Sequence, residues 1–154
     1  FFATLLLAGA TFAQKPAQKP NGAGVYSPWT KAETIRTNDL ASTLRGGAHP
    51  VIFQVGFATL YKSKHVPGAI YAGPASKPEG LEKLREAVAG IPKDREIVIY
   101  CGCCPWDHCP NMKPAYALLH RLGYKRIKVI EIPENFAKDW INKGFPVEGG
   151  TAGR

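Results

Sequence analysis

Residues 97–111 read IVIYCGCCPWDHCPN, and this stretch decides both the fold and the place of the chemistry. Its first four residues, Ile97 to Tyr100, form the continuous apolar run that predicts a strand buried on both faces of a sheet. A helix is predicted over Met112–Leu122, because apolar residues recur there at three- and four-residue spacing and Gly123 follows. Strand, loop and helix in this order predict an α/β unit whose connecting loop is rich in cysteine.

Further strands and helices are predicted on both sides of this unit. Short apolar runs predict the strands, and apolar residues at helical spacing predict the helices. Because strands alternate with helices, we expect an α/β fold of three layers, with a central, mostly parallel sheet. The strands are predicted at 51–55, 69–72 and 127–132, the helices at 37–45, 79–91 and 134–142, and a polar loop at 56–65.

The first thirteen residues, FFATLLLAGATFA, carry no charge and end in small residues. This apolar part is too short to span a bilayer, and Thr11 and Ala13 suit the −3 and −1 sites of a signal peptidase. We therefore expect residues 1–13 to be the end of a signal peptide and residues 14–28, rich in Gln, Pro and Gly, to be a flexible linker. Residues 29–154 then form one domain of an exported protein, periplasmic or secreted, with no membrane span in its mature form.

The charge of the chain argues against a nucleic-acid partner. Its 154 residues include 20 Lys and Arg against 12 Asp and Glu, for a formal charge of +8. The basic residues are scattered, with no run longer than Lys125-Arg126, whereas nucleic-acid binding needs a clustered basic face. The expected consequence is a soluble basic surface with a mild attraction for small anions.

All four cysteines of the chain lie between positions 101 and 109. Disulfides that staple a fold involve cysteines spread along the chain, so this clustering indicates one local site. Cys101 directly follows the predicted strand, at the end of the sheet where α/β proteins bind ligands. The N-terminus of the following helix favours anions and can lower the pKa of a thiol, so Cys101 is the candidate nucleophile.

The other thiols, Cys103, Cys104 and Cys109, have more than one interpretation. Cys101 and Cys104 have the C-x-x-C spacing of thiol–disulfide redox proteins. In an oxidising compartment, Cys103 or Cys104 could instead form a disulfide with Cys109. Together with His108, the four sulfurs could also bind Cu(I) or Zn, but their spacing matches no familiar zinc motif, and we predict neither a metal nor another cofactor.

Polar side chains of the loop have a catalytic and a structural interpretation. Asp107 and His108 could act as acid–base partners of a reacting thiol, or they could be polar residues that support the loop. His65 lies in an apolar segment further upstream and is predicted to be a hydrogen-bonded structural histidine.

Four short segments together resemble the rhodanese family. They follow the family's order and spacing between about Thr37 and Val147. The resemblance implies a rhodanese-like domain with Cys101 as its active cysteine. It also implies transfer of sulfane sulfur from a small anionic donor such as thiosulfate, through a persulfide on that cysteine, to a thiol or cyanide. The segments are His65-Val66-Pro67-Gly68-Ala69-Ile70, Ile97-Val98-Ile99-Tyr100-Cys101, Ala115–Leu122 with Gly123-Tyr124, and Trp140 with Gly144-Phe145-Pro146-Val147.

The chain departs from the family's pattern around this cysteine. Gln54 and Gly56 stand where the family often has an Asp and an Arg. The loop at 101–111 is longer than the family's usual active loop and contains no Lys or Arg. The three further cysteines in it could resolve a persulfide by thiol exchange. The predicted function is a sulfurtransferase, and the alternative is an exported, non-catalytic thiol-redox or metal-binding module on the same fold. No particular protein partner is predicted.

Overall fold

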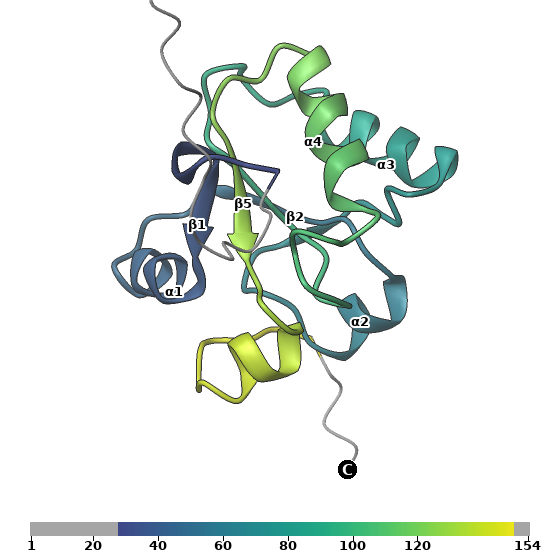
Figure 1. The fold of residues 1–154 in the computed structure, drawn as a ribbon. Coiled ribbons are helices and arrows are strands. Elements are labelled where there is room, and N and C mark those ends of the chain that lie inside the picture. Colours follow the sequence, from purple (N-terminus) through teal and green to yellow (C-terminus); the bar gives the residue numbers. More distant parts are fainter. Residues whose placement is uncertain (1–27, 150–154) are drawn as a thin grey trace, which may run out of the picture.

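A computed structural model describes residues 28–149, so the predicted signal peptide and nearly all of the predicted linker lie outside the described residues. The sheet has five parallel strands in the order β1-β5-β4-β2-β3, and Figure 1 labels β1, β5 and β2 among them. The strands predicted at 51–55, 97–100 and 127–132 lie side by side in its middle. The strands are β1 (Thr34–Arg36), β2 (Val51–Gln54), β3 (Ile70–Tyr71), β4 (Ile97–Tyr100) and β5 (Ile127–Glu131).

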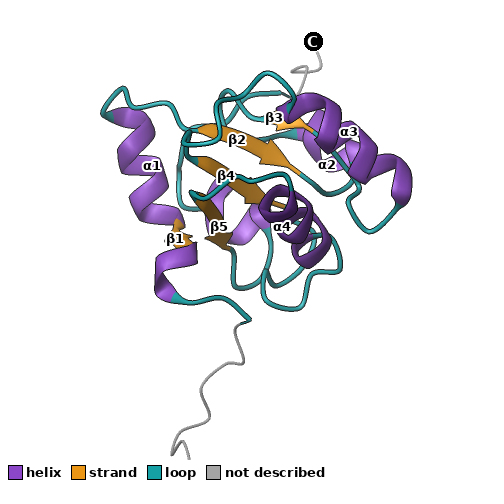
Figure 2. Ribbon diagram, turned by 90° about the horizontal axis from the view of Figure 1, so that it is seen from above, coloured by secondary structure: helices purple, strands orange, loops and turns teal. Residues whose placement is uncertain are grey.

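Helices cover both faces of this sheet, which confirms the predicted three-layer α/β architecture (Figure 2). On one face α3 and α4 pack against the sheet, and on the other face α1 and η2 do so. The middle strand β4 is fully buried because side chains from both layers cover it, as its unbroken apolar run requires. The helices are η1 (Lys31–Glu33), α1 (Thr37–Arg45), α2 (Ala58–Ser63), α3 (Pro78–Val88), α4 (Met112–Arg121) and η2 (Ala137–Ile141).

Helix α2 corrects the sequence prediction, which placed a polar loop at 56–65. The helix has six residues and buries none of them, so its sequence carries no clear apolar stripe. Contacts to the segment that follows it in the chain hold it instead. Tyr61 donates its hydroxyl hydrogen bond to the carbonyl of Ala69 at 2.9 Å, and its ring stacks on that of His65 with ring centres 4.0 Å apart.

Two further elements differ from the expectation in detail. Strand β1 was not predicted, because it has only three residues, without a hydrophobic pattern, at the edge of the sheet. The predicted last helix is a short π-type helix, in which the Asn142 amide donates to the carbonyl of Ala137 at 2.8 Å. No helix among residues 28–149 is long and apolar enough to cross a membrane.

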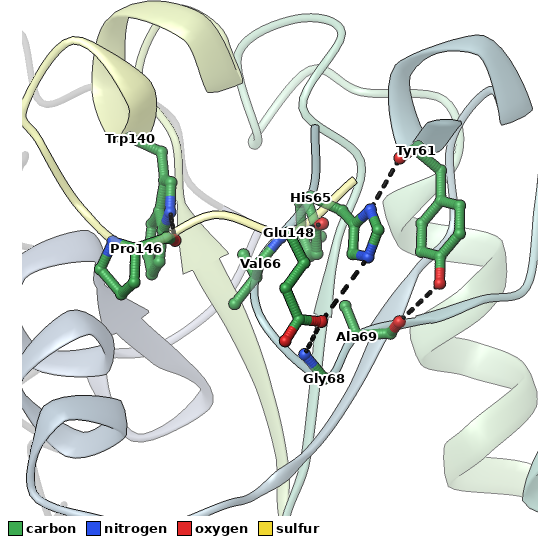
Figure 3. Close-up of polar contacts among 9 residues, drawn as sticks. Tyr61, His65, Val66, Gly68, Ala69, Trp140, Pro146 and Glu148 are labelled. Atoms are coloured by element: carbon green, nitrogen blue, oxygen red, sulfur yellow. Dashed lines mark hydrogen bonds and ion pairs between the residues drawn. The ribbon is translucent and has the colours of Figure 1, made fainter. Parts of the chain in front are cut away.

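The segment after η2 is fastened to the segment before β3 (Figure 3). His65 and Glu148 exchange backbone hydrogen bonds of 2.8 and 2.9 Å, and the Glu148 carboxylate accepts from the amide of Gly68 at 2.9 Å. The Trp140 indole donates to the carbonyl of Pro146 at 2.8 Å. His65 is nearly buried and its Nδ1 lies 2.7 Å from the carbonyl of Tyr61, which fits the structural role predicted for it.

Candidate active site

Cys101 lies directly after β4, where the carboxyl ends of the central strands meet. The register of the sheet places Gln54 of β2 opposite Tyr100 of β4, and Gln54 donates from Nε2 to the carbonyl of Cys101 at 2.9 Å. The side chain of Cys101 is only 3% exposed. The side chain of Gln54, on β2, therefore holds the backbone of Cys101 at the end of the neighbouring strand β4.

The four sulfurs of the loop form one cluster. The Sγ atoms of Cys101 and Cys103 lie 3.1 Å apart, and those of Cys103 and Cys104 lie 3.0 Å apart. The Sγ of Cys109 lies 4.0 Å from that of Cys103. All four are free thiols. The sequence placed these residues in one loop, and the structure brings their sulfurs into hydrogen-bonding contact.

The surroundings of the cluster shift the pKa values of Cys101 and Cys109 in opposite directions. The hydrogen bond between their thiols lowers the pKa of Cys109 to about 5, and the backbone amide of Asn111 stabilises the same thiolate. That hydrogen bond, together with burial, raises the pKa of Cys101, and burial raises the pKa of Cys104. The sequence suggested that Cys101 would be the thiol favoured as an anion. The structure differs because the Cys101 thiol, and after it the backbone amide of Asn111, stabilise the thiolate of Cys109.

Asn111 is a site residue that the sequence analysis missed. It directly precedes α4 and is completely buried. Its amide Nδ2 lies 3.3 Å from the Sγ of Cys101 and 3.9 Å from that of Cys109. The amide of Ser76 donates to its Oδ1 at 2.8 Å, which turns the NH₂ group toward the sulfurs. An Asn before a helix usually indicates a cap, so the sequence alone favours a different role.

The sulfur of Cys101 occupies the space that a side chain at position 56 would need. A Cβ built at this position would lie 2.5 Å from the Sγ of Cys101 and 2.9 Å from the Nε2 of Gln54. The Arg that the rhodanese pattern often has here would therefore displace the sulfur or the strand end. The Oε1 of Gln54 is buried and accepts no hydrogen bond from the described part of the chain.

A cleft of about 510 Å³ opens beside Cys101 and Cys103. Its wall is largely apolar, and Lys64 is the only charged residue among the described residues that line it. Phe57 and Leu60 on the α2 side are 46% and 37% exposed, so the mouth of the cleft presents apolar side chains to solvent. The remaining lining residues are Gln54, Thr59, Ser63, Tyr100, Gly102, Asn135, Phe136, Ala137 and Ile141.

The outer half of the loop is held by packing and by backbone contacts. The ring of Trp106 stacks on Trp29, with ring centres 5.6 Å apart, and its amide donates to the carbonyl of Ile132 at 3.0 Å. Asp107 is buried and pairs with the exposed His108 at 2.9 Å. Neither of these two residues lines the cleft, so their arrangement fits support of the loop rather than contact with a reacting group.

The family model of the rhodanese-like domain matches residues 37–132. No curated protein matches the chain. Similar solved structures include a Bacillus halodurans protein, 23% identical with a TM-score of 0.59, where the match covers 77% of each chain. The rhodanese-like domain of an Anabaena protein is also 23% identical, with a TM-score of 0.56 and coverage of 79% of this chain and 86% of that one. A thiosulfate sulfurtransferase from Pseudomonas aeruginosa is 19% identical with a TM-score of 0.55, covering 78% of this chain but 21% of its own length. At these identities the structures show a shared fold.

Proposed function

Since the chain belongs to the family of rhodanese-like domains, we propose that it transfers sulfane sulfur through a persulfide on Cys101. One observation carries this proposal: the sulfur of Cys101 lies at the carboxyl end of the central strand, beside a cleft, and a second thiol stands 3.1 Å away. Cleft, nucleophile and neighbouring thiol are the parts that a persulfide relay requires. The structural likeness to a thiosulfate sulfurtransferase supports the same chemistry.

In the first step Cys101 attacks the outer sulfur of a donor such as thiosulfate. A bond forms between the Sγ of Cys101 and that sulfur, the sulfur–sulfur bond of the donor breaks, and sulfite leaves with its electron pair. The proton of the Cys101 thiol passes to the Cys109 thiolate, whose Sγ lies within 4.8 Å and whose pKa is lowered. The product is a persulfide on Cys101 that projects toward the cleft.

In the second step a thiol accepts the outer sulfur and Cys101 returns to its starting state. Cys103 is the nearest acceptor within the chain, and it also lines the cleft. Its thiolate attacks the outer sulfur of the persulfide, so that Cys103 becomes the persulfide and Cys101 the leaving thiolate. An external thiol then takes the sulfur from Cys103 in the same manner. Cys103 thus acts as a relay between a buried nucleophile and the solvent.

The surroundings of the cleft favour a thiol acceptor with an apolar part. Phe57 and Leu60 form an apolar rim on the α2 side, and Lys64 supplies a positive charge next to it. A thiol with an apolar or aromatic neighbour and a carboxylate fits such a rim better than cyanide, which is too small to contact it.

Replacing Cys101 tests the proposal directly. We expect Cys101→Ser to lower thiosulfate–thiol transferase activity by at least about a thousandfold, because the nucleophile is lost. Cys109→Ser should slow transfer by about a hundredfold or less, since only proton transfer is impaired. Both rates are compared with those of the wild type, and the mass of one added sulfur is sought on each protein after incubation with thiosulfate.

Cys104→Ser is the matched control, because it removes a thiol of the same loop that does not line the cleft. It should keep the sulfur adduct and most of the activity. Full activity in Cys101→Ser would refute Cys101 as the carrier. A wild type that is inactive with thiosulfate and other sulfane sulfur donors would refute sulfur transfer as a whole.

A further inference from the structure

Three of the four thiols converge on one point. The Sγ atoms of Cys101, Cys103 and Cys109 all lie within 4.8 Å of one another. We propose that these three thiolates bind one Cu(I) ion in trigonal coordination. This inference goes beyond sulfur transfer, because it assigns a resident or regulatory metal to a site that the family uses for sulfur.

The spacing of the sulfurs fits such an ion. With metal–sulfur bonds of about 2.3 Å, three sulfurs around a central ion lie about 4.0 Å from one another. Cys103 and Cys109 already have a separation of 4.0 Å between their Sγ atoms. Cys101 and Cys103 are closer, at 3.1 Å, and must move apart by about 1 Å. Cys103 is only partly buried, so a small rotation of its side chain achieves this.

The donor set selects the metal. Thiolates are soft ligands that favour Cu(I) and Zn(II) over harder ions. Structural zinc is almost always four-coordinate. No histidine or carboxylate among residues 28–149 joins the three thiols, and His108 is instead exposed and paired with Asp107. Cys104 contacts Cys103 but lies outside the group in which all ligand atoms are mutually close. Three sulfurs without a fourth ligand suit Cu(I).

The lack of positively charged residues in the loop also favours a bound metal ion. The loop at 101–111 contains no Lys or Arg, and two of the three sulfurs belong to side chains that are 3% exposed. Several thiolates buried together are unstable unless a positive charge lies among them, and a bound metal ion supplies it.

Asn111 prepares the sulfurs for this role. Its Nδ2 lies within donating distance of both Cys101 and Cys109, and Ser76 holds the amide in that orientation. Outer groups that hydrogen-bond to ligand atoms orient them and stabilise their charge. The cleft beside Cys101 and Cys103 gives the ion a path from solvent. Because Cys101 serves both chemistries, bound copper and a persulfide exclude each other.

Competition with a chromogenic Cu(I) chelator tests the proposal. The reduced full chain, under anaerobic conditions, is titrated with Cu(I) bathocuproine disulfonate. We expect one Cu(I) per chain, with a near-ultraviolet thiolate-to-copper absorption band and three sulfur neighbours by X-ray absorption spectroscopy. Cys103→Ser and Cys109→Ser should lose more than about a hundredfold in affinity. Asn111→Ala should lose about tenfold to a hundredfold.

Cys104→Ser and His108→Ala are the matched controls and should bind Cu(I) as the wild type does. Thermal unfolding of the partly buried Cys103→Ser variant checks that its fold persists, so that a lost affinity reports on the ligand. Unchanged affinity in Cys103→Ser would overturn the proposal. Loss of binding in Cys104→Ser, or preferential binding of Zn(II), would also overturn it in favour of a four-sulfur site. The sulfur adduct on Cys101 is measured without copper. Failure of the sulfur-transfer proposal and failure of the Cu(I) proposal can therefore be told apart.

Discussion

At the scale of single residues, the contact between Gly56 and Cys101 is the tightest constraint on the site. The two residues follow neighbouring strands, and the sulfur of Cys101 fills the volume that any side chain at position 56 would need. The strand end thus accommodates the sulfur of Cys101 because the residue beside it is glycine. The positive charge that the rhodanese pattern often places at this position is therefore absent beside Cys101.

Gly56→Ala should destabilise the protein by about 1–3 kcal/mol, because the added methyl group overpacks a buried site. Urea unfolding at equilibrium measures this change. Gly90→Ala is the control, since a Cβ at position 90 has no heavy atom within 4 Å and surface substitutions usually change stability by less than about 0.5 kcal/mol. Equal stability of the two variants would contradict the close packing at Gly56.

The sequence could predict part of this site. The clustering of all four cysteines within nine residues and the strand before Cys101 indicated one local thiol site, and the sulfurs do meet. The lowered pKa of Cys109 could not be predicted, because it depends on how the Cys101 thiol and, after it, the backbone amide of Asn111 face the Cys109 sulfur in the folded loop. The path of the loop decides which groups face each sulfur, and the pattern of residues does not predict that path.

At the scale of elements, a helix or strand could be predicted when its own apolar pattern stabilises it. It could not be predicted when contacts to other segments do so. The strands β2, β4 and β5 and the helices α1, α3 and α4 have their own apolar patterns, and all six were predicted. Helix α2 and strand β1 owe their form to neighbours: the first to contacts of Tyr61, the second to pairing with β5. Local patterns do not contain such tertiary contributions.

Element η1 shows how a short helix is fixed by a distant one. Tyr116 of α4 donates to the carboxylate of Glu33, and the amide and hydroxyl of Thr30 donate to the same group at 2.8 Å. These hydrogen bonds, that of Tyr116 first, lower the pKa of Glu33. A carboxylate with a lowered folded-state pKa contributes stability at neutral pH, and this contribution disappears as the pH falls through the folded-state value.

Tyr116→Phe should therefore lower the free energy of unfolding at pH 7 by less than about 1 kcal/mol, since Glu33 is only partly buried and water screens its interactions. The difference from the wild type should shrink as the pH is lowered below the range in which Glu33 ionises. Denaturant unfolding at several pH values measures both effects. A difference that stays constant down to low pH would show that the lost hydroxyl acts without the carboxylate.

At the scale of the whole molecule, two core clusters share one sheet, and the ends of the domain are tied back to it. One cluster lies under α3 and α4, the other under α1 and η2. The segment at 146–149 returns to the edge of the sheet through His65, whose ring stacks on Tyr61 of α2 (Figure 3). These contacts connect residues 146–149 with α2, the helix beside the apolar rim of the cleft.

His65→Ala should cost about 1–3 kcal/mol of stability, because it leaves the partly buried carbonyl of Tyr61 without its hydrogen bond. It should also loosen α2, so that amide hydrogen exchange of Ala58–Ser63 accelerates. His49→Ala, at an exposed position, is the matched control and should change neither quantity. Unaltered exchange in α2 would show that the helix does not depend on this histidine.

The stacked pair of Trp29 and Trp106 has an optical consequence. Their ring planes are inclined by 25° with centres 5.6 Å apart, and two indoles at this distance couple their excited states. Exciton coupling gives a pair of circular dichroism bands of opposite sign, whose size depends on how the rings are mutually oriented. Because Trp106 belongs to the cysteine-rich loop, any rearrangement of the thiols by sulfur or copper that tilts this ring changes that couplet. The protein therefore carries its own label-free spectroscopic signal for the state of its cysteine-rich loop.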